Sequence, residues 1–344
     1  MIGIKLSVII PAYNAWEGLI KCIESLKFNI PHEIIIIDDG STDETQKEVK
    51  RRFISNTNIK YVYQENKGVS AARNKGIDLA IGDYIYFIDS DDYLIDSEKL
   101  EMSVLENSND DLIVFGYALE NDSMSNTEYV HFDKRYNFNK ELQYKAFMSD
   151  FFITKTYRTA VWNKVYKRSI IVDYSLRFED YSEIWSEDSL FNLSYISISD
   201  VINITILPHV FIMHTKNLSS LSNSKKQDDV KKRISNSLFK IFKEIDKSKL
   251  YQELKQYYTV DYVLKFSIGS IEINKISYEQ FKNELTNLID DLPNNFRHKF
   301  KISSFSKLYK SKLKLIYHLL IYYLIKYNAI NLLSFCLWKR YKNK

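Results

Sequence analysis

Short apolar runs alternate with amphipathic segments through the first 116 residues, and this alternation constrains the fold more than any other feature of the chain. The runs are rich in β-branched and aromatic residues and cover positions 5–11, 33–37, 59–64, 84–88 and 111–116. Runs of this kind are typical of strands buried in a parallel sheet. Between them, apolar residues recur with a helical period at 16–28, 42–53 and 70–80. The pattern predicts an α/β sandwich built from βαβ units.

The rest of the chain indicates a change of architecture. We expect a polar loop or hairpin near 120–127, mainly helical structure over 140–193 and a strand at 201–213. From about residue 225 the apolar residues keep helical spacing and glycine almost disappears. The predicted regions are a sandwich over 1–222, with halves at 1–116 and 117–222, a helical region over 223–300, and a basic, aromatic helical tail over 301–344.

Several classes of protein are disfavoured by motifs that the chain lacks. Cys22 and Cys336 stand at opposite ends without CxxC spacing, which argues against a disulfide framework or a zinc site. No GxGxxG motif follows a predicted strand, so a dinucleotide-dependent dehydrogenase is disfavoured. The first apolar run is too short for the core of a signal peptide. We therefore expect a cytoplasmic protein.

Acidic side chains cluster after two of the predicted strands. Asp38 and Asp39 follow the second run, and Asp89, Asp91 and Asp92 follow the fourth in the sequence DSDD. The carboxyl ends of parallel strands share one edge of a sheet, where α/β proteins bind ligands, and carboxylate oxygens suit Mg²⁺ or Mn²⁺ on a diphosphate. The alternative interpretation is turn and helix-cap chemistry, in which Asp is also common.

Four segments, VIIPAYN, IIDDGSTD, QENKGVSAARNKG and DSDD, occur in this order over residues 5–95. Their order and spacing resemble family 2 glycosyltransferases, and the similarity continues more loosely to about residue 222. The resemblance implies a GT-A sandwich followed by a helical region. It also implies metal-dependent, inverting transfer of a sugar from a nucleotide diphosphate, with a UDP-sugar as the expected donor.

The resemblance further implies a donor site. Its expected members are Pro11, Ala12, Tyr13, Asn14, Asp39, Asn66, Arg73, Asp89, Ser90, Asp91 and Glu187. Within this set, Asp39 is expected to accept a hydrogen bond from the nucleobase and Tyr13 to stack on it. Arg73 is expected to face the nucleotide and its phosphates, Asp89 to reach the ribose or the metal, and Asp91 to coordinate Mn²⁺ or Mg²⁺.

The segment SEDSLF at 186–191 resembles the family's ED motif. An inverting transfer needs a base that takes the proton of the acceptor hydroxyl. Asp188 is the candidate base, and Glu187 is expected to orient it or to touch the donor sugar. Without the resemblance, the same segment is a helix start capped by Ser186.

Two further segments resemble parts of the family. The stretch WNKVYKR at 162–168 is expected on the acceptor side, through Trp162 and Lys164; a core Trp beside solvated basic residues is the alternative. His214 matches a position that in some members completes the metal shell or touches the diphosphate, with a structural His as the alternative. Thr215 stands where many relatives carry Arg, followed by Lys216 and an SxS-like loop.

Basic and aromatic residues gather at the end of the chain. After Asp291 there are twelve Lys or Arg and no acid. The apolar stretch at 315–338 is long enough to span a bilayer, but His318 and Lys326 interrupt it. Basic flanks with Tyr and Trp favour helices lying on an anionic membrane surface. A helix pair packed on the catalytic domain or on another subunit is the alternative.

Together, the resemblance and the composition of the tail favour a hexosyl- or N-acetylhexosaminyltransferase at the inner face of the cell membrane. The expected acceptor is a lipid-linked saccharide used in the synthesis of capsule, exopolysaccharide or cell wall. A sugar-nucleotide nucleotidyltransferase is one alternative, although PAYNAWEG lacks its Gly-rich basic loop. A non-catalytic nucleotide-sugar-binding module is another, although it would be expected to lack Asp91 or Asp188. No motif indicates nucleic acid, and the sequence leaves open whether the chain forms a homodimer.

Overall fold

The computed structural model places most of the chain in two compact units. It describes residues 5–53, 55–120, 127–132, 146–153, 155–184, 186–198, 203–215, 230–248, 252–268, 277–290, 312–327 and 329–342. The first unit comprises Met1–Tyr144, Tyr157–Ser182 and Glu187–Ser224, and the second Lys145–Thr156, Glu183–Ser186 and Lys225–Lys344. All residues of the predicted donor site belong to the first unit.

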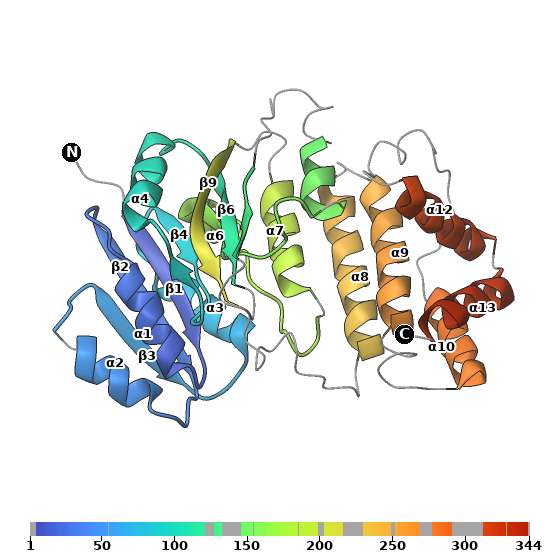
Figure 1. Ribbon diagram of the computed structural model, residues 1–344, viewed down its shortest axis with the longest axis horizontal. Coiled ribbons are helices and arrows are strands. Elements are labelled where there is room, and N and C mark those ends of the chain that lie inside the picture. The colour runs from blue at the N-terminus through green and yellow to red at the C-terminus, as the bar shows by residue number, and fades with distance from the viewer. Residues whose placement is uncertain are drawn as a thin grey trace. The chain divides into compact units, whose positions relative to one another are not determined.

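Among the described residues of the first unit, nine strands form one mixed sheet (Figure 1). They are β1 (Leu6–Ala12), β2 (His32–Asp39), β3 (Ile59–Gln64), β4 (Tyr84–Phe87), β5 (Tyr93–Leu94), β6 (Leu112–Leu119), β7 (Glu128–Val130), β8 (Lys164–Lys167) and β9 (Ile204–His214). The order is β3-β2-β1-β4-β8-β6-β9-β5, with β7 beside β6. Strands β1 to β4 pair in parallel. This confirms the α/β fold that the apolar runs predict.

The helices of the first unit follow the strands along the chain. They are α1 (Trp16–Ser25), α2 (Thr45–Phe53), α3 (Val69–Leu79), α4 (Ser97–Glu106), α6 (Arg168–Asp173) and α7 (Glu187–Ser197). Helix α3 packs on β1 and β2, and α1 packs beside α2. The contact between α3 and β1 is close, because a Cβ added at Gly76 would lie 2.3 Å from Cγ2 of Ile9.

The described part of residues 140–193 contains the expected helical segments and, in addition, a strand that the sequence did not predict. Strand β8 lies within them, between β4 and β6 and antiparallel to both. Its four residues, KVYK, are too few to show a strand period in the sequence. A loop or hairpin is expected near 120–127. Strands β6 and β7, which flank this segment, pair antiparallel as in a hairpin, and residues 121–126 between them lie outside the described residues.

The described part of the second unit is helical. It contains a π-helical turn (Ser149–Ile153), α8 (Val230–Ser248), α9 (Gln252–Ile268), α10 (Tyr278–Asp290), α12 (Lys312–Lys326) and α13 (Ile330–Tyr341). Helix α9 contacts each of the other elements, and aromatic side chains such as Tyr258 and Tyr262 are buried on it. The C-terminal helical region is therefore confirmed. Within the residues that the structure describes, no helix is both long and apolar enough to cross a bilayer.

Candidate active site

The predicted donor residues gather at one edge of the sheet. Pro11 and Ala12 end β1, Asp39 ends β2, and Asp89 follows β4 by two positions. Strand β9 runs in the same direction, because it is parallel to β6, and both β6 and β4 are antiparallel to β8. His214, the last residue of β9, therefore lies at the same edge, where open α/β sheets bind ligands.

Asn14 joins the loops that follow β1 and β2. Its Oδ1 accepts from the N–H of Thr42 at 2.8 Å, and its own N–H donates to Oγ of Ser41 at 2.9 Å. Its φ of 48° is one that Asn tolerates better than most residues. Tyr13, the preceding residue, is 47% exposed. The loop therefore holds an aromatic ring at the surface of the site, available for stacking on a planar ligand.

Asp39 organises the loop before α3. Its Oδ1 accepts from Nε2 of Gln64 at 2.8 Å and from the N–H of Lys67 at 2.9 Å, and its Oδ2 accepts from the N–H of Gly68 at 2.8 Å. Three of about four acceptor positions are thus used within the protein. One acceptor position is not used by these three bonds. Asn66, in the same loop, is exposed.

Arg73 joins the donor side of the site to the candidate base. It lies on α3 with its side chain 5% exposed, and its guanidinium donates to Oδ1 of Asp89 at 2.9 Å and to Oδ1 of Asp188 at 2.8 Å. Oε1 of Glu187 lies 3.6 Å from Nη1. Glu187 and Asp188 form the first turn of α7. One guanidinium therefore brings three predicted acids from two distant segments into a single cluster.

The charges in this cluster perturb one another. Burial raises the pKa of Glu187 to about 7; the charge of Asp188 adds to this increase and Arg73 opposes it. Burial likewise raises the pKa of Asp188, with Arg73 opposing and Asp89 adding. For Arg73, burial lowers the pKa, but the nearby acids outweigh burial and raise it overall. A raised pKa makes the carboxylate of Asp188 a stronger base, which suits proton transfer.

The DSDD loop lies against α1. A Cβ added at Gly18 would lie 2.9 Å from the carbonyl oxygen of Ser90 and 3.1 Å from Cα of Asp91. Only glycine permits this approach without a shift of the backbone. Asp89, Ser90 and Asp91 remain partly exposed. Burial and the charge of Asp89 raise the pKa of Asp91, so a cation placed beside the two acids would relieve their repulsion.

Asp92, the fourth acid of the loop, has a different environment, which sequence reasoning missed. It is fully buried, and both of its carboxylate oxygens lie 3.0 Å from Nδ1 of His214. Its Oδ1 also accepts from the N–H of Thr215 at 3.0 Å. The imidazole of His214 stacks on Trp162, with ring centroids 4.6 Å apart and planes 13° apart. Asp92 therefore holds the edge of the His214 ring by hydrogen bonding, and Trp162 holds its face by stacking.

This edge fits a divalent cation held jointly with a diphosphate. No three His, Cys, Asp or Glu side chains of the described residues are placed to hold a metal by themselves. Hard cations such as Mg²⁺ are commonly held by one or two protein ligands together with substrate phosphates. Asp91 and His214 offer a carboxylate and an imidazole of this kind.

The acceptor-side expectation does not fit the position of Lys164. This side chain is fully buried, and its Nζ donates to the carbonyl oxygens of Ala160 at 2.7 Å and Arg158 at 3.0 Å. Burial lowers its pKa well below the usual value. The alternative prediction, in which Lys164 is a solvated residue beside a core Trp, does not fit either, because the side chain is buried. Lys164 instead fixes the loop at 157–160, which reaches α7 through the bond from Asn192 to the carbonyl of Thr159.

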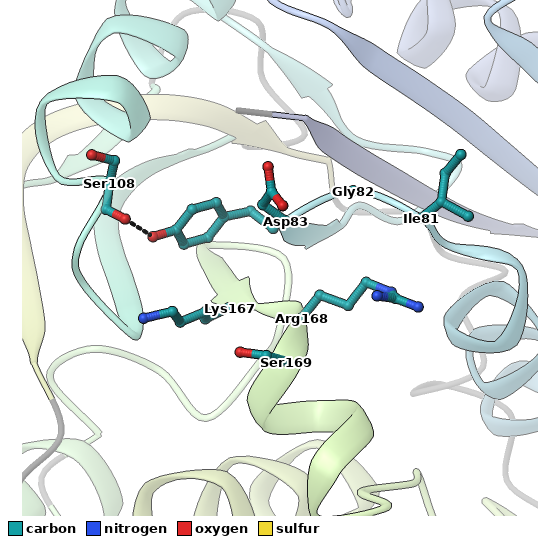
Figure 2. Close-up of a pocket in the computed structure, with 8 residues that line it drawn as sticks. Ile81, Gly82, Asp83, Ser108, Lys167, Arg168 and Ser169 are labelled. Carbon is teal, nitrogen blue, oxygen red and sulfur yellow. Dashed lines mark hydrogen bonds between the residues drawn. The ribbon is translucent and has the colours of Figure 1, made fainter. Parts of the chain in front are cut away.

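A separate pocket of about 260 Å³ lies at the opposite edge of the sheet (Figure 2). Ile81, Gly82, Asp83, Tyr84, Ser108, Lys167, Arg168 and Ser169 line it. Tyr84 begins β4 and pairs with Lys167, the last residue of β8. The two basic residues that end WNKVYKR therefore lie away from Asp89. Lys216 and the loop at 217–222 lie outside the described residues.

Residues 7–172 match the model of the family described as Glycosyl transferase family 2. These residues belong to glycosyltransferase family 2. EpsH of Bacillus subtilis (strain 168) and YibD of Escherichia coli (strain K12), both named as glycosyltransferases, are each 32% identical, over 174 and 199 residues. The alignments cover 50% and 55% of this chain, which spans about half the length of these relatives, 49% of EpsH and 57% of YibD.

Solved structures extend the comparison beyond the family 2 segment. Residues 1–349 of Staphylococcus aureus TarS, solved with UDP-GlcNAc, superpose with a TM-score of 0.66 at 20% identity, covering 98% of this chain and 92% of that one. The complex of the same protein with UDP gives a TM-score of 0.64. The predicted GT-A fold with C-terminal helices is thereby confirmed. Asp188 and His214 lie beyond residues 7–172, and their roles remain predictions.

Proposed function

We propose that this chain is an inverting glycosyltransferase that moves a sugar from a UDP-sugar to a saccharide acceptor. The observation that carries the proposal is the pair of hydrogen bonds that Arg73 donates to Asp89 and Asp188, at 2.9 and 2.8 Å. Direct displacement needs a base close to the anomeric carbon of the bound donor. A base and a donor-side acid that share one guanidinium satisfy this requirement.

Donor binding uses the loops at the edge of the sheet. Tyr13 stacks on the uracil ring, and the remaining acceptor position of Asp39 receives a base N–H. Asn66 and Ser90 line the nucleotide, and Asp89 faces the ribose. Binding of TarS to UDP and UDP-GlcNAc supports a uridine donor here, because the two folds superpose along most of both chains.

Transfer uses Asp188, oriented by Arg73 and neighbouring Glu187. Its carboxylate takes the proton of the acceptor hydroxyl while the hydroxyl oxygen bonds to the anomeric carbon and the bond to the diphosphate breaks. A Mn²⁺ or Mg²⁺ ion held by Asp91 and His214 would supply positive charge to the departing diphosphate. Trp162, although almost buried, adjoins this region through His214.

The test is release of UDP from a panel of UDP-sugars, with saccharide acceptors and with Mn²⁺ present. We expect Asp188→Asn to lose at least a hundredfold in turnover and to keep its affinity for the donor. Asp173→Asn, on the exposed side of α6, is the matched control and should turn over normally.

The alternatives give different results. Formation of a nucleotide sugar from a nucleoside triphosphate and a sugar phosphate would indicate a nucleotidyltransferase. Donor binding without UDP release in the wild-type chain would indicate a binding module. Normal turnover of Asp188→Asn would remove Asp188 as the base.

We further propose that α12 and α13 attach the chain to an anionic membrane surface at the inner face of the cell membrane, next to a lipid-linked acceptor. Ile316 and Leu320 are exposed four residues apart on one face of α12, and Tyr327, which is also exposed, directly follows its last residue. On α13, the exposed Leu332 and Phe335 precede Lys339 and Arg340 in the last turn. The acid-free sequence after Asp291 gives this surface a single sign of charge.

Vesicle sedimentation tests the attachment. We expect the full chain to sediment with phosphatidylcholine vesicles containing phosphatidylglycerol and much less with phosphatidylcholine alone. The double variant Leu332→Glu, Phe335→Glu should stay in solution, whereas Phe239→Glu, at an even more exposed position on α8, should bind like the wild type. Equal binding by both variants, or a change of oligomeric state in the double variant, would show that the surface serves another purpose, such as subunit contact.

A further inference from the structure

The pairing of β5 with β9 places Asp92 opposite His214. Tyr93 pairs with Met213 and Leu94 with Ile212 in an antiparallel register. Continued by one residue, this register brings Asp92 next to His214, although the two are 122 positions apart. The register of the short strand β5 with β9 therefore determines that the carboxylate of Asp92 lies next to the imidazole of His214.

Asp92 is satisfied entirely inside the protein. It has no exposed surface, and its two oxygens accept from Nδ1 of His214 and from the N–H of Thr215. Thr215 in turn donates its hydroxyl to the carbonyl oxygen of Asp91 at 2.6 Å. Asp92 is thus placed to act through its neighbours, since a ligand cannot reach it directly.

His214 is fixed in two independent ways. The bond to Asp92 sets the rotation of the ring in its plane and puts a proton on Nδ1, because a carboxylate accepts. Stacking on Trp162 sets the plane itself. In the neutral ring, Nε2 then carries the lone pair and points away from Asp92, and 31% of the His214 side chain is exposed.

We propose that Asp92 is a positioning residue that presents Nε2 of His214 to the metal of the metal–diphosphate group. The proposal rests on the donor chemistry proposed above. Imidazoles that bind metals usually donate their other N–H to a carboxylate, which fixes the tautomer and raises the basicity of the ligand nitrogen. Here the same arrangement exists within the protein before any donor binds.

Binding of UDP and Mn²⁺ to the full chain tests the proposal without turnover. Removing an outer carboxylate of this kind typically weakens metal affinity by 10–100-fold, so we expect Asp92→Asn to bind Mn²⁺ in the presence of UDP about tenfold more weakly. His214→Gln should lose at least as much. In the His214→Gln background, Asp92→Asn should have no further effect, because the two residues act as one unit.

Asp111→Asn is the matched control, since Asp111 is a part-buried acid paired with Lys167 at the opposite edge of the sheet. It should leave Mn²⁺ affinity unchanged. Equal losses from Asp92→Asn in both backgrounds would show a merely structural role and overturn the proposal. If the wild type binds UDP but gains nothing from Mn²⁺, the metal part of the proposed function fails, and this inference fails with it.

Nitrogen-15 NMR of the wild-type histidine rings provides a readout that does not depend on metal binding. The six histidines are sorted by the loss of one ring signal in His214→Gln. The proposal requires the proton of the neutral ring on Nδ1 and the lone pair on Nε2. The opposite tautomer in the wild type overturns it, whatever the binding data show.

Discussion

The substitution Glu187→Gln measures how much the ionisation of Glu187, in the cluster around Arg73, lowers the free energy of unfolding. The pKa of Glu187 is raised from 4.5 to about 7, so its protonated form is favoured in the folded state. The stabilising effect of protonation is complete below the unfolded value near 4.5 and is lost as the pH rises through about 7. At 1.36 kcal/mol for each pKa unit, the loss is about 3 kcal/mol. The amide of Gln has no such dependence.

Urea unfolding of the full chain between pH 5 and 8.5 measures the difference. We expect the wild type and Glu187→Gln to be similarly stable at pH 5, and the variant to be more stable at pH 8 by up to about 3 kcal/mol, a value that already includes the opposing attraction of Arg73. Glu106→Gln, at an exposed position on α4, should follow the wild type at every pH. Parallel curves for the wild type and Glu187→Gln would refute the reasoning.

Three other substitutions probe the same framework. Arg73→Met leaves three acids without their shared cation, and urea unfolding at pH 8 should show a loss of about 3 kcal/mol; an unchanged midpoint would mean that the cluster relaxes into solvent. Gly76→Ala pushes a methyl group to within 2.3 Å of Ile9 and should cost about 1–3 kcal/mol, whereas a stabilised variant would show that α3 can move. Gly18→Ala should weaken UDP binding in calorimetry by displacing Asp91, yet leave stability within about 1 kcal/mol, since Ala favours helix; normal UDP affinity would contradict the close packing.

The strands and their polar ends could be predicted because each depends on local sequence. Apolar β-branched runs identify β1 to β4, and parallel pairing then puts the ends of all four at one edge. Asp39 and Asp89 are therefore found without any structure. Their hydrogen bonds could not be predicted. The donors to Asp39 lie at the end of β3 and in the loop that follows it, 25 to 29 positions away, and no local pattern encodes that distance.

Two residues, Lys164 and Asp92, are buried in the structure although the sequence suggests that their charged side chains are exposed. Lys164 looks solvated in the sequence because lysine usually is, yet carbonyl groups of the preceding loop enclose its ammonium. Asp92 looks like a spare acid of DSDD, and only the register of β5 with β9 reveals its partner. Four-residue and two-residue strands carry too little periodicity to be recognised, so the contacts they create were beyond prediction.

The long sequence separations inside the cluster have a consequence for folding and synthesis. Arg73 meets Asp188 across 115 positions, and Asp92 meets His214 across 122. Contacts of this range form late, because the chain must close a long loop before they stabilise anything. A nascent chain that has reached only the end of β6 therefore holds most of the proposed donor-site residues but neither Asp188, the proposed base, nor His214. On this reasoning, the proposed capacity for transfer arises in a single late step, when β9 joins the sheet and α7 brings Asp188 to Arg73.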